Sequence, residues 1–225
     1  MDKRFDRKVI RILGLLLGLV LALPAFSQPP LPDIQTRAEA LTALEDANAR
    51  LRAAAVLYIG RTGTAADGPL LVKRLSDESP VVRAVAEPSV WRVWSRSGDA
   101  ETDRLLAAGV EEMEMGLYAE AIHTFSNVIQ RSPEFAEGWN KRATALFLIG
   151  DLHGSLADCD EVMKRNPQHF GALSGYGQIY FQLKEYEKSI EYFRRALAIN
   201  PNLANLEITI RAIEKLMQKR RDRMI

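Results

Sequence analysis

The stretch that decides the fold runs from residue 136 to residue 203 and consists of two consecutive segments of equal length. Residues 136–169 read AEGWNKRATALFLIGDLHGSLADCDEVMKRNPQH and residues 170–203 read FGALSGYGQIYFQLKEYEKSIEYFRRALAINPNL. A third segment, 102–135, precedes them, and each of the three has a proline at the same position, namely Pro133, Pro167 and Pro201. A period of roughly 20–50 residues is typical of stacked-helix proteins. The copies therefore predict a helical solenoid, which presents an extended binding surface rather than a catalytic cleft.

Each segment places large and small side chains at fixed positions, which indicates a pair of helices in close contact. Small residues are needed at positions 8 and 20, where the two helices touch. The second helix ends at a Ser-Pro or Asn-Pro dipeptide, because proline disfavours a helical residue before it and has no N–H. The residues are Leu105, Trp139 and Leu173 (position 4), Gly109, Ala143 and Gly177 (8), Tyr118, Leu152 and Tyr186 (17), Ala121, Ser155 and Ser189 (20), and Phe125, Cys159 and Phe193 (24).

These positions resemble the tetratricopeptide repeat family in three consecutive copies, 102–135, 136–169 and 170–203. Two residues depart from the family pattern, Glu112 at an internal position and Arg142 one repeat later. A buried carboxylate needs a partner, so Arg142 is a candidate partner for Glu112. The alternative is that both side chains reach water.

The resemblance implies that a peptide or protein partner binds along the first helix of each pair. Two glycines in the third repeat, Gly171 and Gly175, are four residues apart and share one helix face. Each costs about 1 kcal/mol relative to alanine in a helix, and two explanations remain open: close packing against the neighbouring helix, or room for a ligand backbone. The predicted groove residues are Asn140, Thr144, Phe147, Gly171, Ser174, Gly175, Gln178 and Phe181.

Some members of the family bind a C-terminal carboxylate through a clamp of lysine, asparagine and arginine side chains. This sequence has Asn140 and Lys141, but Gly171 and Gly175 stand where the third repeat supplies basic groups. The resemblance therefore does not extend to a carboxylate clamp.

A weaker repeat with a period of 31 residues occupies residues 34–100. Leu44, Asp46, Arg52, Ala53 and Ala55 are matched by Leu75, Asp77, Arg83, Ala84 and Ala86. Each copy predicts a capping acid followed by a helix, and Pro88 is expected to interrupt the second one. The pattern resembles the HEAT family, in which an Asp–Arg pair links neighbouring repeats, so these acids and arginines have a structural interpretation.

The sequence shows no separate partner helix for the second HEAT-like copy. The helix expected over 101–115 would then serve both repeat types, and HEAT-like helices would continue into the tetratricopeptides without a flexible linker. After Pro201, apolar residues at helical spacing predict a capping helix with a basic tail over 204–225. The predicted fold class is all-α, a right-handed helical-repeat solenoid.

The N-terminus carries a basic head and an apolar run from Ile12 to Leu23, followed by Ala25-Phe26-Ser27. This pattern is typical of a secretory signal peptide, residues 1–27, cleaved after Ser27. A Pro-rich spacer, 28–33, follows it. We therefore expect a periplasmic or secreted protein, with an uncleaved anchor as the alternative.

Composition narrows the possible partners. The whole chain has a net charge of +1 and residues 1–27 contribute +5 − 2 = +3, so the remainder carries +1 − 3 = −2. A near-neutral chain has no electrostatic footprint for nucleic acid. The basic residues after Gln218 favour a solvated helix end, with an anionic lipid or acidic partner as the alternative. The lone Cys159 is predicted to be a small buried hydrophobic residue.

No catalytic, metal or cofactor site is predicted. His123, His153 and His169 fall on different faces without ligands at metal-binding spacing, and no strand pattern supports a phosphate loop. The sequence predicts a monomeric, non-catalytic adaptor or scaffold for protein binding in envelope assembly or secretion. The alternatives are an accessory subunit of an envelope enzyme complex and a membrane-attached factor.

Overall fold

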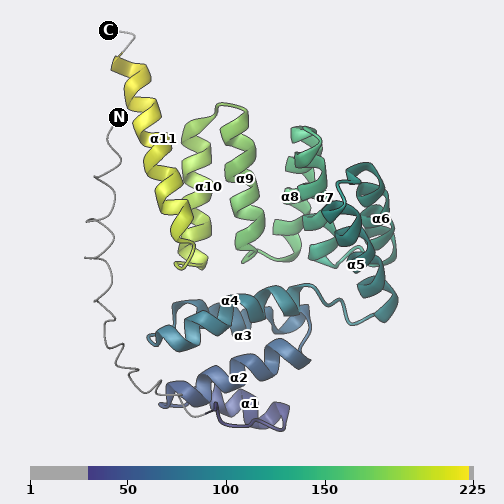
Figure 1. Cartoon of the computed structure of the whole chain (residues 1–225), viewed down its shortest axis with the longest axis vertical. Helices are drawn as coiled ribbons and strands as arrows, with labels where there is room; N and C mark the ends of the chain where they lie inside the picture. The colour runs from purple at the N-terminus through teal and green to yellow at the C-terminus, as the bar shows by residue number, and fades with distance from the viewer. Residues whose placement is uncertain (1–29, 223–225) are drawn as a thin grey trace, which may run out of the picture. The chain divides into compact units, whose positions relative to one another are not determined.

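The computed structural model describes residues 30–222, and from Leu31 onward the chain packs as one compact unit. The predicted signal peptide and the last three residues of the basic tail lie outside the described residues. Within the described range every regular element is helical and no strand occurs, which confirms the predicted all-α repeat fold (Figure 1). The helices are α1 (Arg37–Ala43), α2 (Ala49–Thr62), α3 (Gly68–Val72), α4 (Pro80–Trp94), α5 (Ala100–Glu114), α6 (Tyr118–Arg131), α7 (Ala136–Leu148), α8 (Leu152–Arg165), α9 (Phe170–Gln182), α10 (Tyr186–Ile199) and α11 (Ala204–Asp222).

The three tetratricopeptide copies form the helix pairs α5–α6, α7–α8 and α9–α10. Their tight turns require a left-handed residue, which is Gly116 in the first copy and Gly150 in the second, with φ of 76° and 84°. The third copy uses Lys184 at φ 63° instead. Glycine adopts this conformation without the steric cost that a Cβ imposes.

Steric fit holds each outer pair together. A Cβ built on Gly109 would lie 2.5 Å from the Phe125 ring, and one on Gly177 would lie 2.4 Å from the Phe193 ring. Both rings are buried. The small residue at position 8 is therefore needed because the position 24 ring lies directly on the backbone of the partner helix.

The HEAT-like region contains two helix pairs. The expectation that the second copy has no separate partner helix is wrong. Helix α4 packs against α3, which is extended by a short 3-10 turn over Lys73–Ser76. Pro88 lies inside α4 without ending it. The helix caps are Asn48 and Ser79 rather than the acids two residues earlier. The carboxylates of Asp46 and Asp77 instead accept the N–H groups of those two cap residues.

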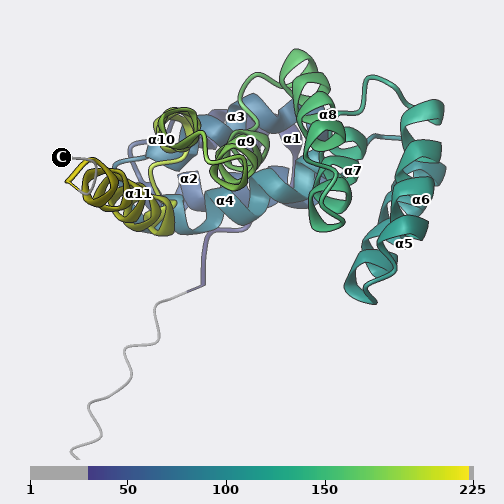
Figure 2. The same ribbon diagram turned by 90° about the horizontal axis from the view of Figure 1, so that it is seen from above.

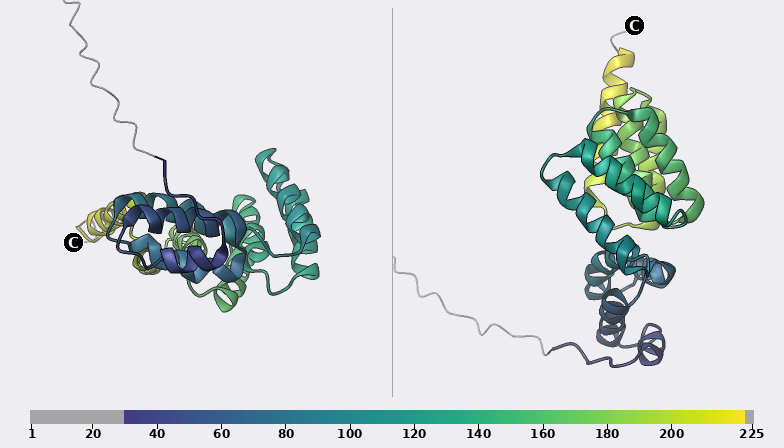
Figure 3. Two further views of the ribbon diagram at one scale, coloured as in Figure 1. Left: turned by 90° about the horizontal axis from the view of Figure 1, so that it is seen from below. Right: turned by 90° about the vertical axis from the view of Figure 1, so that its right-hand side faces the viewer.

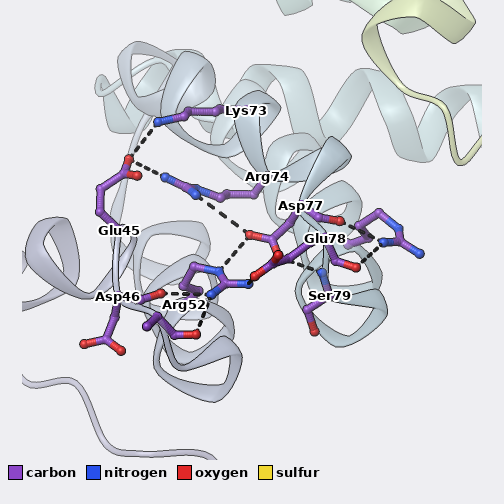
Figure 4. Close-up of polar contacts among 10 residues, drawn as sticks. Glu45, Asp46, Arg52, Lys73, Arg74, Asp77, Glu78 and Ser79 are labelled. Carbon is purple, nitrogen blue, oxygen red and sulfur yellow. Dashed lines mark hydrogen bonds and ion pairs between the residues drawn. The ribbon is translucent and has the colours of Figure 1, made fainter.

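A buried ion pair joins the two HEAT-like copies, as the resemblance implies (Figure 4). Arg52 donates to both oxygens of Asp77, at 2.9 and 2.8 Å, and both side chains are more than nine-tenths buried. Its remaining nitrogen donates to the carbonyls of Asp46 and Ala47. Each of the three guanidinium nitrogens therefore donates a hydrogen bond, as a buried charge requires.

The predicted sharing of helix α5 between the two repeat types is wrong. Helix α5 packs with α6 and α7, whereas the apolar core of the HEAT-like region continues into Phe170 and Leu173 of α9. Figure 1 shows α4 crossing the ends of α9 and α10, and Figure 3 (right) shows the HEAT-like helices, in purple and blue, at one end of the tetratricopeptide helices. The chain turns back after α4 at residues 95–99, and the HEAT-like region docks on the third repeat rather than extending the row (Figure 2).

Aromatic side chains form the contact between α4 and the third repeat. Trp91 meets the Phe170 ring edge-on at 5.1 Å, and Trp94 stacks on the His169 ring at 4.4 Å. On α10 of the same repeat, Ile210 and Ile213 of α11 cover Phe193. Helix α11 therefore covers the last apolar face, as predicted for the capping helix.

Candidate functional site

A hollow of about 120 Å³ lies between the first helices of the second and third repeats. Helices α7 and α9 supply its walls and α8 supplies its floor. It is lined by Asn140, Ala143, Thr144, Phe147, Ser155, Cys159, Gly171, Ala172, Gly175, Gln178 and Ile179.

The hollow brings together six of the eight residues predicted for the groove. Ser174 and Phe181 lie outside it. The Ser174 hydroxyl donates to the Phe170 carbonyl at 2.9 Å. Phe181 is 43% exposed and packs against the Tyr186 ring near the C-terminal end of α9. Ser174 therefore lies on another side of α9, and Phe181 lies beyond the hollow near the C-terminal end of that helix.

Gly171 and Gly175 are glycines for different structural reasons. A Cβ on Gly171 would lie 2.4 Å from the Trp91 ring, so this glycine is needed for the docking of α4. A Cβ on Gly175 would meet only the Cys159 sulfur, at an ordinary 3.6 Å. No packing contact requires a glycine at position 175, and the missing side chain leaves open space inside the hollow.

A difference between the repeats at positions 8 and 24 also creates this space. Repeats 1 and 3 pair glycine with phenylalanine at positions 8 and 24, whereas repeat 2 pairs Ala143 with Cys159. Cysteine is much smaller than phenylalanine, and its sulfur forms part of the floor. The second repeat therefore lacks the ring that fills the corresponding space in its neighbours.

The polar groups on the inner surface are satisfied within the protein. The Ser155 hydroxyl donates to the Ala143 carbonyl at 2.8 Å, and the Thr144 hydroxyl donates to the Asn140 carbonyl at 3.0 Å. Cys159 is buried, as predicted. Burial, with Asp158 and Asp160 nearby, raises the pKa of its thiol to about 12. No charged side chain lines the hollow at neutral pH.

Two amide side chains retain hydrogen-bonding capacity. The Asn140 amide nitrogen donates to Glu137 at 3.2 Å, while its Oδ1 accepts no hydrogen bond from any residue between 30 and 222. Gln178 is exposed and bonds to none of these residues through its side chain. A few polar groups around an apolar space are typical of a ligand site.

A buried polar cluster beneath the hollow holds Asn140 and the start of α9. His169 caps α9 by accepting the Ala172 N–H at Nδ1, so Nε2 carries the proton and donates to Glu137 at 3.0 Å. Burial alone would raise the pKa of Glu137, but His169 and Lys141 outweigh it and lower the pKa. Sequence reasoning missed this contact because the two residues lie 32 positions apart, at opposite ends of the second repeat, and no local spacing links them.

The basic residues of the second repeat are already engaged. Lys141 lies 3.2 Å from Glu137. Arg142 donates to both oxygens of Asp158, at 2.7 Å each, and to Ser126 at 3.0 Å. It does not pair with Glu112, whose Oε2 is buried without a hydrogen-bond partner among the described residues. The hollow therefore has no basic group available for a carboxylate.

A larger cavity of 540 Å³ lies between Trp94 of α4 and the turns before α7 and α9. Its charged residues are already paired, since His169 bonds Glu137 and Arg165 bonds Glu161. Between residues 30 and 222, no group of three His, Cys, Asp or Glu side chains is placed to hold a metal ion. None of the helices in this range is long and apolar enough to cross a bilayer.

Comparison with known proteins assigns both repeat types. A family profile for HEAT repeats matches residues 2–90, and two tetratricopeptide repeat profiles match residues 106–163 and 172–203. The chain therefore contains HEAT-like and tetratricopeptide repeats. No family of enzymes is indicated.

Each of the relatives named below matches about half of this chain. A TPR repeat-containing protein of Rhizobium etli is 32% identical over 48% of this chain and 53% of its own length. Hsp70-Hsp90 organizing protein 1 of Glycine max is 26% identical over 52% of this chain and 20% of its own length. The chain thus spans about half of the first relative and a fifth of the second.

Solved structures confirm the fold of the tetratricopeptide region. The first TPR domain of Spaghetti (RPAP3), bound to an HSP90 peptide, superposes with a TM-score of 0.51 at 23% identity, covering 53% of this chain and 96% of that domain. The Sgt2 TPR domain of Aspergillus fumigatus gives 0.52 at 17% identity, covering 55% of this chain and 83% of that one.

Proposed function

We propose that this protein is a non-catalytic adaptor that binds an extended segment of a partner protein along α7 and α9. The observation that carries the proposal is the hollow between these helices, where six predicted groove residues meet. The Spaghetti domain, which has the same fold, was solved with a bound peptide. The Hsp70-Hsp90 organizing proteins among the relatives also favour partner binding.

A photocrosslinking amino acid tests this location. Placed at Gln178, on the rim of the hollow, it should capture a discrete partner in intact cells. The same residue placed at Glu191, exposed on α10 and outside the hollow, serves as the matched control. Equal capture from both positions, or from the control alone, would place the interaction elsewhere.

We further propose that the protein acts outside the cytoplasm, in envelope assembly or secretion. The basic head, apolar run and small residues before Gln28 support export. The hollow has no charged side chain in its lining, which favours a protein partner over nucleic acid there. Sequencing the N-terminus of the native protein tests export: we expect Gln28 as the first residue, and a chain still beginning with Met1 contradicts cleavage.

A further inference from the structure

We propose that the hollow binds one uncharged aliphatic side chain, of leucine or methionine size, from an internal segment of the partner. This inference rests on the proposed peptide-binding function and specifies what the hollow selects. It is carried by the size of the hollow, by its lining and by the two amide groups on its rim.

Size limits the side chain. Apolar cavities of about 150 Å³ hold a benzene-sized group. A hollow of about 120 Å³ is slightly smaller and fits the four heavy atoms of a leucine, isoleucine or methionine side chain. The open space above Gly175 belongs to this volume, because nothing but the Cys159 sulfur approaches within 4 Å of a Cβ there.

The lining disfavours charge. Phe147, Ile179 and the alanines offer apolar contact, and the hydroxyls of Ser155 and Thr144 are already bonded to backbone carbonyls. A buried charge without a partner is costly. An anion would find no counter-charge here, because no charged side chain lines the hollow and Arg142 is already paired with Asp158. A free C-terminal carboxylate is therefore excluded from the hollow itself.

The rim favours a peptide backbone. The Asn140 Oδ1 can accept an N–H group, because the amide nitrogen of the same side chain is held by Glu137. The exposed Gln178 amide offers both a donor and an acceptor. Backbone hydrogen bonds on each side of an inserted side chain are a common mode of reading an extended peptide.

Small blocked amino acids test the chemistry directly in the purified protein. N-acetyl-L-leucinamide presents the side chain and two amides without charge, and methyl NMR of Ile179, Ala143 and Ala172 reports occupation of the hollow. We expect saturable shifts of these methyl groups. N-acetyl-L-leucine, which adds only a carboxylate, should bind at least about tenfold more weakly because the hollow has no counter-charge.

Gly175→Leu supplies the decisive variant, since its side chain occupies the hollow; Gly175→Ala keeps most of the space and serves as the control. We expect the shifts to vanish in the leucine variant and to persist in the alanine variant, with helicity by circular dichroism unchanged in both. Shifts that persist in Gly175→Leu, a tighter complex with the carboxylate form, or no saturable shift in the wild type would overturn the inference. If Gln178 still crosslinks a partner in that case, partner binding stands and only the selectivity of the hollow fails.

Discussion

The HEAT-like and tetratricopeptide regions both stack pairs of helices but fix neighbouring helices by different forces. Between the HEAT-like copies, the Arg52–Asp77 ion pair is buried and fully bonded. Within the outer tetratricopeptide pairs, an aromatic ring lies directly on a glycine, as with Phe193 on Gly177. The first device depends on the charge state of two side chains and the second only on shape. The two regions should therefore respond differently to mutation and to pH.

The largest effect is expected from Asp77→Ala. Removing one partner of a buried pair leaves Arg52 with only the exposed Glu78, at 3.2 Å, as a carboxylate partner, and breaking such a pair costs about 3–5 kcal/mol of folding free energy. Asp46→Ala is the matched control, because the exposed Asp46 makes the same turn contact to a backbone N–H but has no buried arginine partner. Urea denaturation of both variants measures the difference, and equal losses would contradict an energetic role for the ion pair.

The stability contributed by this pair should be lost in acid. Burial alone would raise the pKa of Asp77, but hydrogen bonds from Arg52 and the Ser79 N–H lower it. A carboxyl group whose pKa is lower in the folded state stabilises the fold above its unfolded value of about 3.9 and loses that contribution as the pH falls. The stability gap between wild type and Asp77→Ala should therefore be constant from neutral pH to about 5 and narrow below about 4. A gap that widens in acid would reverse the sign of the argument.

Steric fit should give the next largest effect. Gly177→Ala forces a methyl group into the buried Phe193 ring and is expected to cost about 1–3 kcal/mol by overpacking. Repeat 2 provides the comparison, because Ala143 already faces the small Cys159 there. Cys159→Phe should be destabilising for the same reason, since it combines the ring with the alanine. Thermal unfolding should show both losses, with little change in their size between pH 7 and 4.

Gly171 and Gly175 of α9 should give smaller effects that are opposite in sign to each other. Gly171→Ala meets the Trp91 ring, so overpacking of about 1–3 kcal/mol exceeds the helix gain of about 1 kcal/mol. Gly175→Ala meets no such obstacle and should stabilise the protein by up to about 1 kcal/mol. Melting temperatures of the two variants on either side of the wild type would separate a packing glycine from one that keeps the hollow open.

The smallest effect is expected at the turn of the third repeat. Lys184→Gly relieves a left-handed lysine, and the gain should stay below about 1 kcal/mol because glycine also makes the unfolded chain more flexible. The reverse change in the first repeat, Gly116→Lys, should cost a similar amount, since the site is open and only the backbone conformation is at issue. The denaturant midpoints of both variants test whether the gain at position 184 and the cost at position 116 are similar in size.

The sequence by itself determined the local architecture. The 34-residue period fixes where each helix pair begins and ends, because small residues mark helix contacts and proline stops the second helix. The same spacing placed Asn140, Thr144, Phe147, Gly171, Gly175 and Gln178 on facing surfaces, and the structure brings these six together. The Asp–Arg pairing between HEAT-like copies was implied by the resemblance to the HEAT family, and the Arg52–Asp77 pair is present.

Only the tertiary structure decided how the two repeat regions meet. Docking depends on contacts between residues far apart in the chain, such as Trp91 with Gly171, and no local period encodes them. The Trp91 contact also distinguishes Gly171, which makes room for that ring, from Gly175, although the two glycines look alike in the sequence. Whether a missing side chain leaves space or accommodates a neighbour depends on what lies opposite it in three dimensions, and for Gly175 that neighbour is a small cysteine rather than a ring.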